Sequence, residues 1–221
     1  MKASQISYQD RFALLGSSRG LGWSTYQALE KSYPQSQFLL SSRKIAGRKN
    51  EISLATTLVP QDFSKSPVNE SFLNVLKTFH PTTLVYFAGG GPYGLFGEKK
   101  WSDHQWALHT TFLYPAELVH SIFSDLSSWP DLRQIVLIGS AIAEAQPDPL
   151  AASYAAAKHA LKGLVTSMQK ESISLPRLRL FSPGYMQTDL LPANSKPRQL
   201  GLSENPFDVA KKLIAFIEKS D

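Results

Sequence analysis

The sequence of 221 residues contains no cysteine, which excludes disulfide bonds and thiolate metal ligands. It has no apolar run of about 20 residues, the length that a membrane-spanning helix needs. The N-terminal segment MKASQISYQDRF lacks the apolar core of a secretory signal. No internal repeat or linker rich in Gly or Ser divides the chain. We therefore expect one domain over residues 1–221, in a reducing cytoplasm and without membrane contact.

Acidic residues are fewer than basic ones, at 18 against 23, which gives a formal net charge of +5 and favours anionic partners. The basic residues are scattered and form no dense tract of the kind that binds nucleic acid. A phosphorylated cofactor or an anionic substrate explains the excess equally well, so we expect no nucleic-acid partner. The 5 histidines show no spacing typical of metal ligands, so we predict no metal site.

Short apolar runs alternate along the chain with longer segments of helical periodicity. Strands are predicted at residues 12–16, 37–42, 56–61, 83–89, 134–140 and 177–183. Helices are predicted at residues 22–32, 67–79, 103–126, 152–172 and 206–219, with Ser66 as N-cap of the second and a kink at Pro115 in the third. This alternation predicts an α/β fold: a doubly wound, Rossmann-type parallel sheet of about six strands with helices on both faces.

Three glycines stand where the first predicted strand meets the first predicted helix, in LGSSRGLG at residues 15–22. Glycines at this place let the backbone turn tightly and approach a pyrophosphate closely, while the N–H groups of the helix N-terminus face the phosphates. A strand-to-helix turn with glycines for packing alone would show the same spacing.

Tyr154 and Lys158 are four residues apart and therefore project from one face of the predicted helix. Leu161 and Val165 continue that face, which indicates that it points inward. An ammonium group near a phenol stabilises the phenolate and lowers the pKa of the phenol, as general acid–base catalysis at neutral pH requires. A snorkelling pair on a solvated helix face is the alternative interpretation.

Taken together, five motifs make the sequence resemble the short-chain dehydrogenases/reductases over residues 12–190. They occur in the order found in that family: LGSSRGLG at 15–22, PQDFSK at 60–65, GSA at 139–141, YAAAK at 154–158 and PGYMQT at 183–188. The first departs from the family pattern in having Leu15 where Thr is usual. The resemblance implies hydride transfer between a nicotinamide dinucleotide and a carbonyl or alcohol substrate.

The resemblance also assigns roles within the site. Tyr154 would be the proton donor, Lys158 would lower its pKa and hold the nicotinamide ribose, and Ser140 would bind the substrate oxygen. Thr111 aligns with the Asn that completes a proton relay in the family, but its hydroxyl has a shorter reach. The predicted catalytic residues are therefore Ser140, Tyr154, Lys158 and Thr111.

Two basic residues favour NADP(H) over NAD. Arg43 follows the second predicted strand, where a carboxylate would bind the ribose of NAD, and Arg19 lies inside the glycine turn. Ordinary surface arginines are the alternative. The predicted cofactor-binding residues are Gly16, Ser18, Arg19, Gly20, Leu21, Gly22, Arg43, Asp62, Phe63, Ala88, Gly89, Gly90, Tyr154, Lys158, Pro183, Gly184, Met186 and Thr188.

Other positions depart from the family pattern. Phe87 replaces the second residue of the family's Asn-Asn-Ala-Gly, no seventh strand follows the last predicted helix, and the segment after Thr188 is short for a substrate lid. We therefore expect a shallow, open substrate site. Two functions remain open: an NADPH-dependent carbonyl reductase acting on a small molecule, or an NADP(H)-binding sensor or scaffold with weak or no catalysis. Small residues on the helix of Tyr154, such as Ala156 and Gly163, predict close packing in a homodimer.

Overall fold

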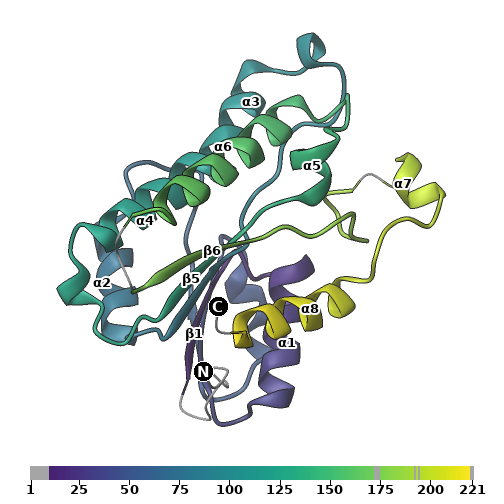
Figure 1. Cartoon of the computed structure of the whole chain (residues 1–221). Coiled ribbons are helices and arrows are strands. Elements are labelled where there is room, and N and C mark those ends of the chain that lie inside the picture. Colours follow the sequence, from purple (N-terminus) through teal and green to yellow (C-terminus); the bar gives the residue numbers. More distant parts are fainter. Residues whose placement is uncertain (1–9, 172–174, 192, 194, 220–221) are drawn as a thin grey trace.

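The computed structural model describes residues 10–171, 175–191, 193 and 195–219, and it confirms the predicted α/β fold (Figure 1). All strand pairs are parallel, and the six strands form one sheet in the order β3-β2-β1-β4-β5-β6. The strands are β1 (Arg11–Leu15), β2 (Gln37–Ser41), β3 (Thr56–Val59), β4 (Thr83–Tyr86), β5 (Gln134–Ile138) and β6 (Arg177–Phe181). Each lies within its predicted run or begins one residue before it.

Helices occupy the connections between the strands. The α-helices are α1 (Gly20–Ser32), α2 (Glu70–Phe79), α3 (Trp101–Leu108), α4 (Tyr114–Phe123), α5 (Ala141–Ala145), α6 (Ala152–Met168), α7 (Lys196–Gln199) and α8 (Pro206–Glu218). Shorter helical turns are η1 (Ile45–Glu51), η2 (Phe96–Glu98), η3 (His109–Leu113) and η4 (Leu126–Ser128). No helix within the described ranges is long and apolar enough to cross a membrane. The N-terminal residues 1–9 and residue 172 of a predicted helix lie outside those ranges.

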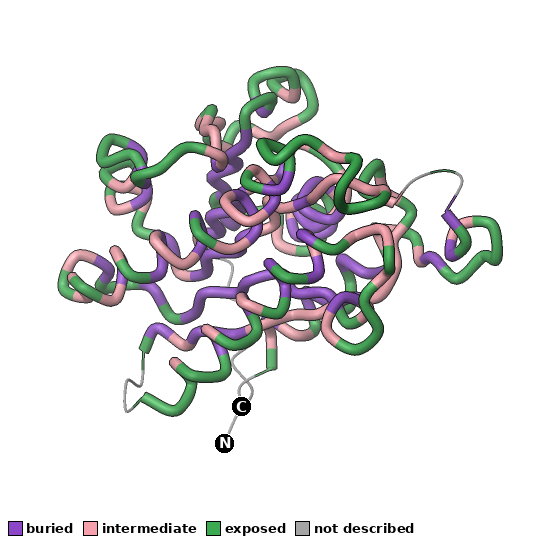
Figure 2. Tube along the Cα trace, turned by 90° about the horizontal axis from the view of Figure 1, so that it is seen from above, coloured by how far each residue is buried: buried purple, intermediate pink, exposed green. Residues whose placement is uncertain are grey.

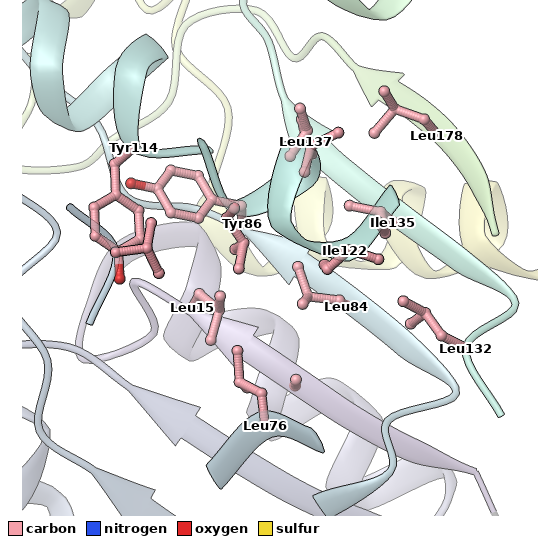
Figure 3. Packing of buried hydrophobic residues seen from close by; sticks show 14 of the residues in the cluster. Leu15, Leu76, Leu84, Tyr86, Tyr114, Ile122, Leu132, Ile135, Leu137 and Leu178 are labelled. Atoms are coloured by element: carbon pink, nitrogen blue, oxygen red, sulfur yellow. The ribbon is translucent and has the colours of Figure 1, made fainter. Parts of the chain in front are cut away.

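Each face of the sheet has its own apolar core because successive side chains of a strand point to opposite faces. Phe12 and Leu14 pack with α1 and α8 on one face. Ala13 and Leu15 belong to the other core, which α2, α4 and α6 cover (Figure 1). Figure 3 shows this second core, in which Leu76 of α2 lies over the sheet. Burial on both faces explains why the strands read as continuous apolar runs.

Two predicted helix features were wrong in detail. The N-cap of α2 is Asn69, whose side chain accepts the N–H of Phe72 at 3.2 Å, and not Ser66. The third predicted helix is interrupted by the π-helical turn η3, which lies just before Pro115 rather than at it. Proline has no N–H to donate to the carbonyl of Thr111 four residues earlier, so the regular pattern fails in that preceding turn.

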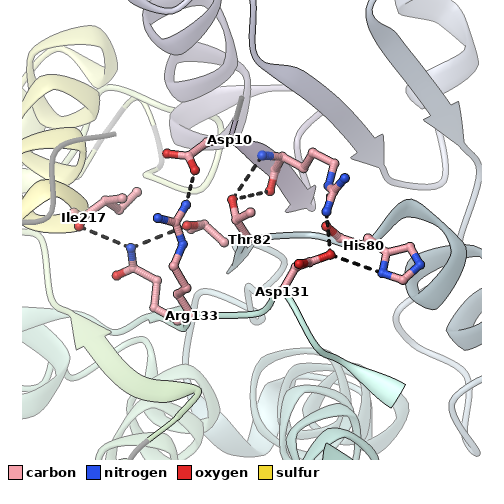
Figure 4. Close-up of polar contacts among 9 residues, drawn as sticks. Asp10, His80, Thr82, Asp131, Arg133 and Ile217 are labelled. Atoms are coloured by element: carbon pink, nitrogen blue, oxygen red, sulfur yellow. Dashed lines mark hydrogen bonds and ion pairs between the residues drawn. The ribbon is translucent and has the colours of Figure 1, made fainter. Parts of the chain in front are cut away.

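Polar contacts join the amino ends of the central strands (Figure 4). Arg133, which precedes β5, forms a hydrogen-bonded ion pair with Asp10, which precedes β1. Asp131 forms an ion pair with Arg11 at 2.6 Å, and its carboxylate lies 3.3 Å from the ring of His80. The carboxyl ends of the strands instead open into loops, and these loops carry the motifs of the sequence. Figure 2 shows the buried central strands and the more exposed loops at the rim.

Candidate active site

A cavity of about 550 Å³ lies at the carboxyl ends of the strands. It is lined by the loops after β1 and β4, the two neighbours from which the chain continues in opposite directions across the sheet. Such a switch point leaves a crevice because the two connecting segments diverge. Every predicted cofactor-binding residue except Gly90 lines this cavity, although the individual roles stay predictions. Gly90 lines a smaller adjoining cavity.

The glycine turn has the geometry that a pyrophosphate requires. Gly16 has a φ of 93°, and a Cβ atom there would lie 2.4 Å from the backbone nitrogen of Ala88. Arg19, the N-cap of α1, makes no side-chain capping bond, so its side chain leaves the N–H groups of the first helical turn free to face a phosphate. The buried hydroxyls of Ser42 and Thr110 also line the cavity and have no hydrogen-bond partner among the described residues. These features fit a bound dinucleotide.

Basic side chains lie at the end of the cavity that would take the adenosine. Arg43 is exposed, and its Nε lies 4.0 Å from Asp62. Burial opposes ionisation of Asp62, but hydrogen bonds from Ser64 and the charge of Arg43 hold the pKa of this carboxyl below its usual value. Arg19 forms an exposed ion pair with Asp189 at 2.9 Å, which joins the glycine turn to the segment after Thr188.

Arg48 supports the glycine turn and was not found from the sequence. Its Nε donates to the carbonyl of Ser18 at 3.0 Å, and its guanidinium carbon lies 4.3 Å from the ring centroid of Trp23. The short helical turn η1 carries Arg48 to this place, and no motif marks it. The contact restrains the backbone between Gly16 and Gly20 from the side of β2.

Tyr154, Lys158 and Ser140 come together where α6 crosses the carboxyl end of β5. Lys158 is 3% exposed, and its Nζ donates to the carbonyl of Ile138 at 2.5 Å. The same Nζ lies 5.4 Å from the ring centroid of Tyr154, whose hydroxyl is hydrogen-bonded to Ser140. The burial of Lys158 contradicts the alternative of a solvated surface pair.

Burial sets the ionisation of both groups. It raises the pKa of Tyr154 to about 12, with the hydrogen bond from Ser140 acting in the opposite direction. It lowers the pKa of Lys158 to about 8. At neutral pH the phenol therefore keeps its proton and the amine remains mostly charged. A protonated phenol beside an ammonium group is the state that a proton donor to a carbonyl needs.

Thr111 is buried within η3, and its hydroxyl is hydrogen-bonded to the loop after β4. It accepts the N–H of Gly90 and donates to the carbonyl of Gly90, each at 3.1 Å. A Cβ atom on the neighbouring Gly89 would lie 3.2 Å from this hydroxyl and 3.6 Å from the Nζ of Lys158. Thr111 thus holds the backbone beside Lys158, and its part in a proton relay stays a prediction.

Glu144 is a buried carboxylate beside the site that the motifs did not indicate. Its side chain is 8% exposed. One carboxylate oxygen accepts the N–H of Ser140 at 2.9 Å and the hydroxyl of Ser182 at 2.7 Å, and the other lies 3.6 Å from Lys162. Its negative charge raises the pKa of Tyr154 and of Lys158, in each case as a smaller effect than burial. A carboxylate four residues after the N-cap of a short helix was the only signal in the sequence.

A second cavity, of about 120 Å³, adjoins the first. The two share Ser140, Tyr154, Gly184, Met186, Thr188 and Leu190. Ser140 and Tyr154 therefore stand at the junction of a large cavity that fits a dinucleotide and a small one that fits a substrate. Leu190, from the segment after Thr188, is still 53% exposed, and the expectation of an open substrate site stays a prediction.

A doubly wound sheet with a glycine turn and a Ser–Tyr–Lys group at its carboxyl edge defines the class of dinucleotide-dependent oxidoreductases. The family model described as short chain dehydrogenase matches residues 13–199. The chain therefore belongs to the short-chain dehydrogenase family and is an NAD(P)-dependent oxidoreductase.

Known proteins are similar to this chain over most of its length. The cyclic-di-GMP-binding biofilm dispersal mediator protein of Escherichia coli (strain K12) is 26% identical over 191 residues, covering 85% of this chain and 77% of that protein. BdcA in complex with NADPH superposes with a TM-score of 0.77 at 20% identity, over 97% of this chain and 89% of that one. A 3-ketoacyl-(acyl-carrier-protein) reductase from Brucella melitensis, complexed with NADH, gives a TM-score of 0.79 at 18% identity over 96% and 92%.

Replacing Glu144 with Gln keeps an acceptor for the N–H of Ser140 and removes the negative charge. Without that charge the pKa values of Tyr154 and Lys158 both fall, so the protonated pair is lost at lower pH. We expect the alkaline limb of the kcat/KM profile for carbonyl reduction to move to lower pH in Glu144→Gln. The matched control is Glu171→Gln, an exposed carboxylate beyond the end of α6, which should keep the wild-type profile. An unmoved limb in Glu144→Gln would contradict the electrostatic role.

Proposed function

We propose that this protein is an NADPH-dependent carbonyl reductase that converts a small ketone or aldehyde to an alcohol, reversibly. The observation that carries the proposal is the position of Ser140 and Tyr154 at the junction of the two cavities, with the ammonium of Lys158 beneath the ring of Tyr154. A carbonyl group at this junction would lie beside both hydroxyls and at the edge of the large cavity.

The chain's own residues account for the proton and for the charge on oxygen. The Ser140 hydroxyl donates a hydrogen bond to the carbonyl oxygen and stabilises the negative charge that develops there. Tyr154 transfers its phenolic proton to that oxygen, and Lys158 stabilises the phenolate that remains. NADPH, when held in the large cavity, would supply the hydride, with its electron pair, that the carbonyl carbon takes up. The C=O bond becomes an alcohol, and Tyr154 regains its proton from water.

Exposed arginines support the preference for NADPH. Arg43 follows β2, and the carboxylates among the described residues that line the cavity already have partners: Asp62 is stabilised by its bonds to Ser64 and by the charge of Arg43, and Asp189 pairs with Arg19. Arg19, in the glycine turn, lines the same cavity. A guanidinium group matches the geometry of a phosphate and binds it by charge-assisted hydrogen bonds.

Arg43→Ala should weaken NADPH binding by about ten- to a hundredfold, because a hydrogen bond to a charged group contributes about 1.5–3 kcal/mol. Binding of NADH, which lacks the 2′-phosphate, should change much less. The dissociation constants are measured by titrating the nicotinamide fluorescence. Lys49→Ala removes an equal charge from η1 outside the cavity and serves as the control. Equal losses for NADH and NADPH would contradict the assignment.

A second candidate is an NADP(H)-binding sensor with weak or no catalysis. The name of the Escherichia coli relative, a cyclic-di-GMP-binding dispersal mediator, supports a signalling role. Phe87 and Thr111, which replace two Asn residues of the family pattern, support weak catalysis. The buried Lys158 opposes this candidate, because burying an ammonium group that has no catalytic task is costly.

Stopped-flow measurement of NADPH oxidation against a panel of ketones and aldehydes separates the two candidates. We expect turnover in the wild type, and a loss of about 10²- to 10⁴-fold in kcat in Tyr154→Phe, because the proton donor is gone. NADPH binding should persist in that variant. Tight NADPH binding without turnover on any member of the panel would contradict the reductase and favour the sensor, and a titration with cyclic-di-GMP would then test the signalling role.

We further propose a homodimer formed through the outer face of α6. Ala156 and Gly163 lie exposed on that face, and a Cβ atom at Gly163 would meet no neighbouring side chain within 4 Å. Leu113, in the neighbouring turn η3, is 50% exposed and adds apolar area. Light scattering at micromolar concentration should give twice the mass of the chain. Replacing Gly163 with Glu should give a monomer, and a monomeric mass for the wild type would contradict the proposal.

A further inference from the structure

The smaller cavity carries one charged side chain among mostly apolar walls. Ile142, Ala143, Ala151 and Leu191 contribute apolar surface. Asp148 contributes a carboxylate from the loop between α5 and α6. This wall belongs to the same cavity as Ser140 and Tyr154, so a molecule whose carbonyl reaches those hydroxyls lies within reach of the loop of Asp148.

Asp148 is held in a fixed orientation and lacks a cation partner within the described ranges. One of its carboxylate oxygens accepts the N–H of Leu150 at 3.0 Å. The other lies 3.4 Å from the hydroxyl of Tyr93, which donates to it. None of the described Lys, Arg or His side chains forms an ion pair with it. The side chain is half-buried, so its charge is less screened than that of an exposed Asp.

Two aromatic rings accompany this carboxylate. Tyr93 precedes η2, and Tyr185 follows β6, and both line the smaller cavity. Burial raises the pKa of each phenol, and the negative charge of Asp148 raises both further. Tyr93 is hydrogen-bonded to Asp148, and Tyr185 lines the same small cavity as this carboxylate. Aromatic rings and a carboxylate each attract a cation and repel an anion.

We propose that the substrate carries a protonated amine close to its reacting carbonyl, and that Asp148 binds this ammonium group between Tyr93 and Tyr185. The inference rests on the proposed carbonyl reductase and adds the class of substrate. A neutral hydroxyl could also donate to Asp148, but hydrogen bonds between charged groups are about twice as strong. A carboxylate with no cation of its own therefore favours an ammonium ligand, and it disfavours carboxylate or phosphate substrates.

The volume favours a small molecule. The smaller cavity has about 120 Å³ and adjoins the larger one at Ser140 and Tyr154, so a short amino ketone with its carbonyl at this junction suits it better than a steroid or a long acyl chain. Dimethylaminoacetone and 4-methylpentan-2-one are matched probes, because they have the same shape and the same number of non-hydrogen atoms. Only the first carries a charge near neutral pH.

The test compares kcat/KM for the two ketones in the wild type and in Asp148→Asn. The wild type should prefer dimethylaminoacetone by about tenfold or more, and this ratio should fall towards one in Asp148→Asn. The amide can still accept the N–H of Leu150, so the loop should keep its place. Asp103→Asn, an exposed carboxylate on α3 outside both cavities, should keep the wild-type ratio. The preference should also weaken as salt is added.

Failure of the inference and failure of the proposed function give different results. Turnover of both ketones without a preference, or an unchanged preference in Asp148→Asn, overturns the amine assignment and leaves the reductase standing. If neither ketone is reduced, calorimetric titration of each probe into the NADP⁺-saturated protein still decides the assignment. Tighter binding of the amine to wild type than to Asp148→Asn supports it, and equal binding overturns it.

Discussion

The hydrogen bond from Lys158 to the carbonyl of Ile138 is the contact on which the site depends. It joins α6 to the last residue of β5, a buried strand that pairs with β4 and β6. Ser140 follows two residues later and Tyr154 precedes Lys158 by one helical turn, so this contact fixes the two hydroxyls relative to each other. The burial that makes the contact possible also sets the pKa values of Tyr154 and Lys158. The burial of Tyr154 and Lys158 therefore accounts both for the positions of the catalytic side chains and for their pKa values.

The sheet was predictable from the sequence because its strands are buried on both faces and each reads as an apolar run. The helix boundaries were less predictable. Asn69 and Ser66 are equally good N-cap residues for α2 as far as the sequence shows, and only packing selects one of them. The motifs brought the cofactor cavity and Ser140, Tyr154 and Lys158 together as expected. Glu144, Arg48 and Asp148 lie outside the motifs, and their importance comes from contacts with distant residues such as Ser182 and Tyr93. No spacing rule records contacts of that kind.

The charges of the site are distributed unevenly along the two cavities. The large cavity is lined by four basic residues and two acidic ones: Arg19, Arg43, Lys44, Lys158, Asp62 and Asp189. Asp148 is the one charged residue among the described residues that line the smaller cavity. The net charge of +5 therefore describes the chain and not the substrate pocket. An excess of basic residues is compatible with a cationic substrate when the excess lies on the cofactor side. Local sign, rather than total charge, decides which small molecules are admitted.

The exposed ion pair between Arg19 and Asp189 joins two residues that line the large cavity and lie far apart in the chain. A phosphate that arrives beside Arg19 competes with Asp189 for the same guanidinium. The net electrostatic gain is then the attraction of Arg19 for the phosphate minus its attraction for Asp189. This gain is smaller than an arginine without a partner would provide. In the proposed complex, this exchange would remove the ion pair that joins Asp189 to the glycine turn, while Thr188 would remain beside Gly20.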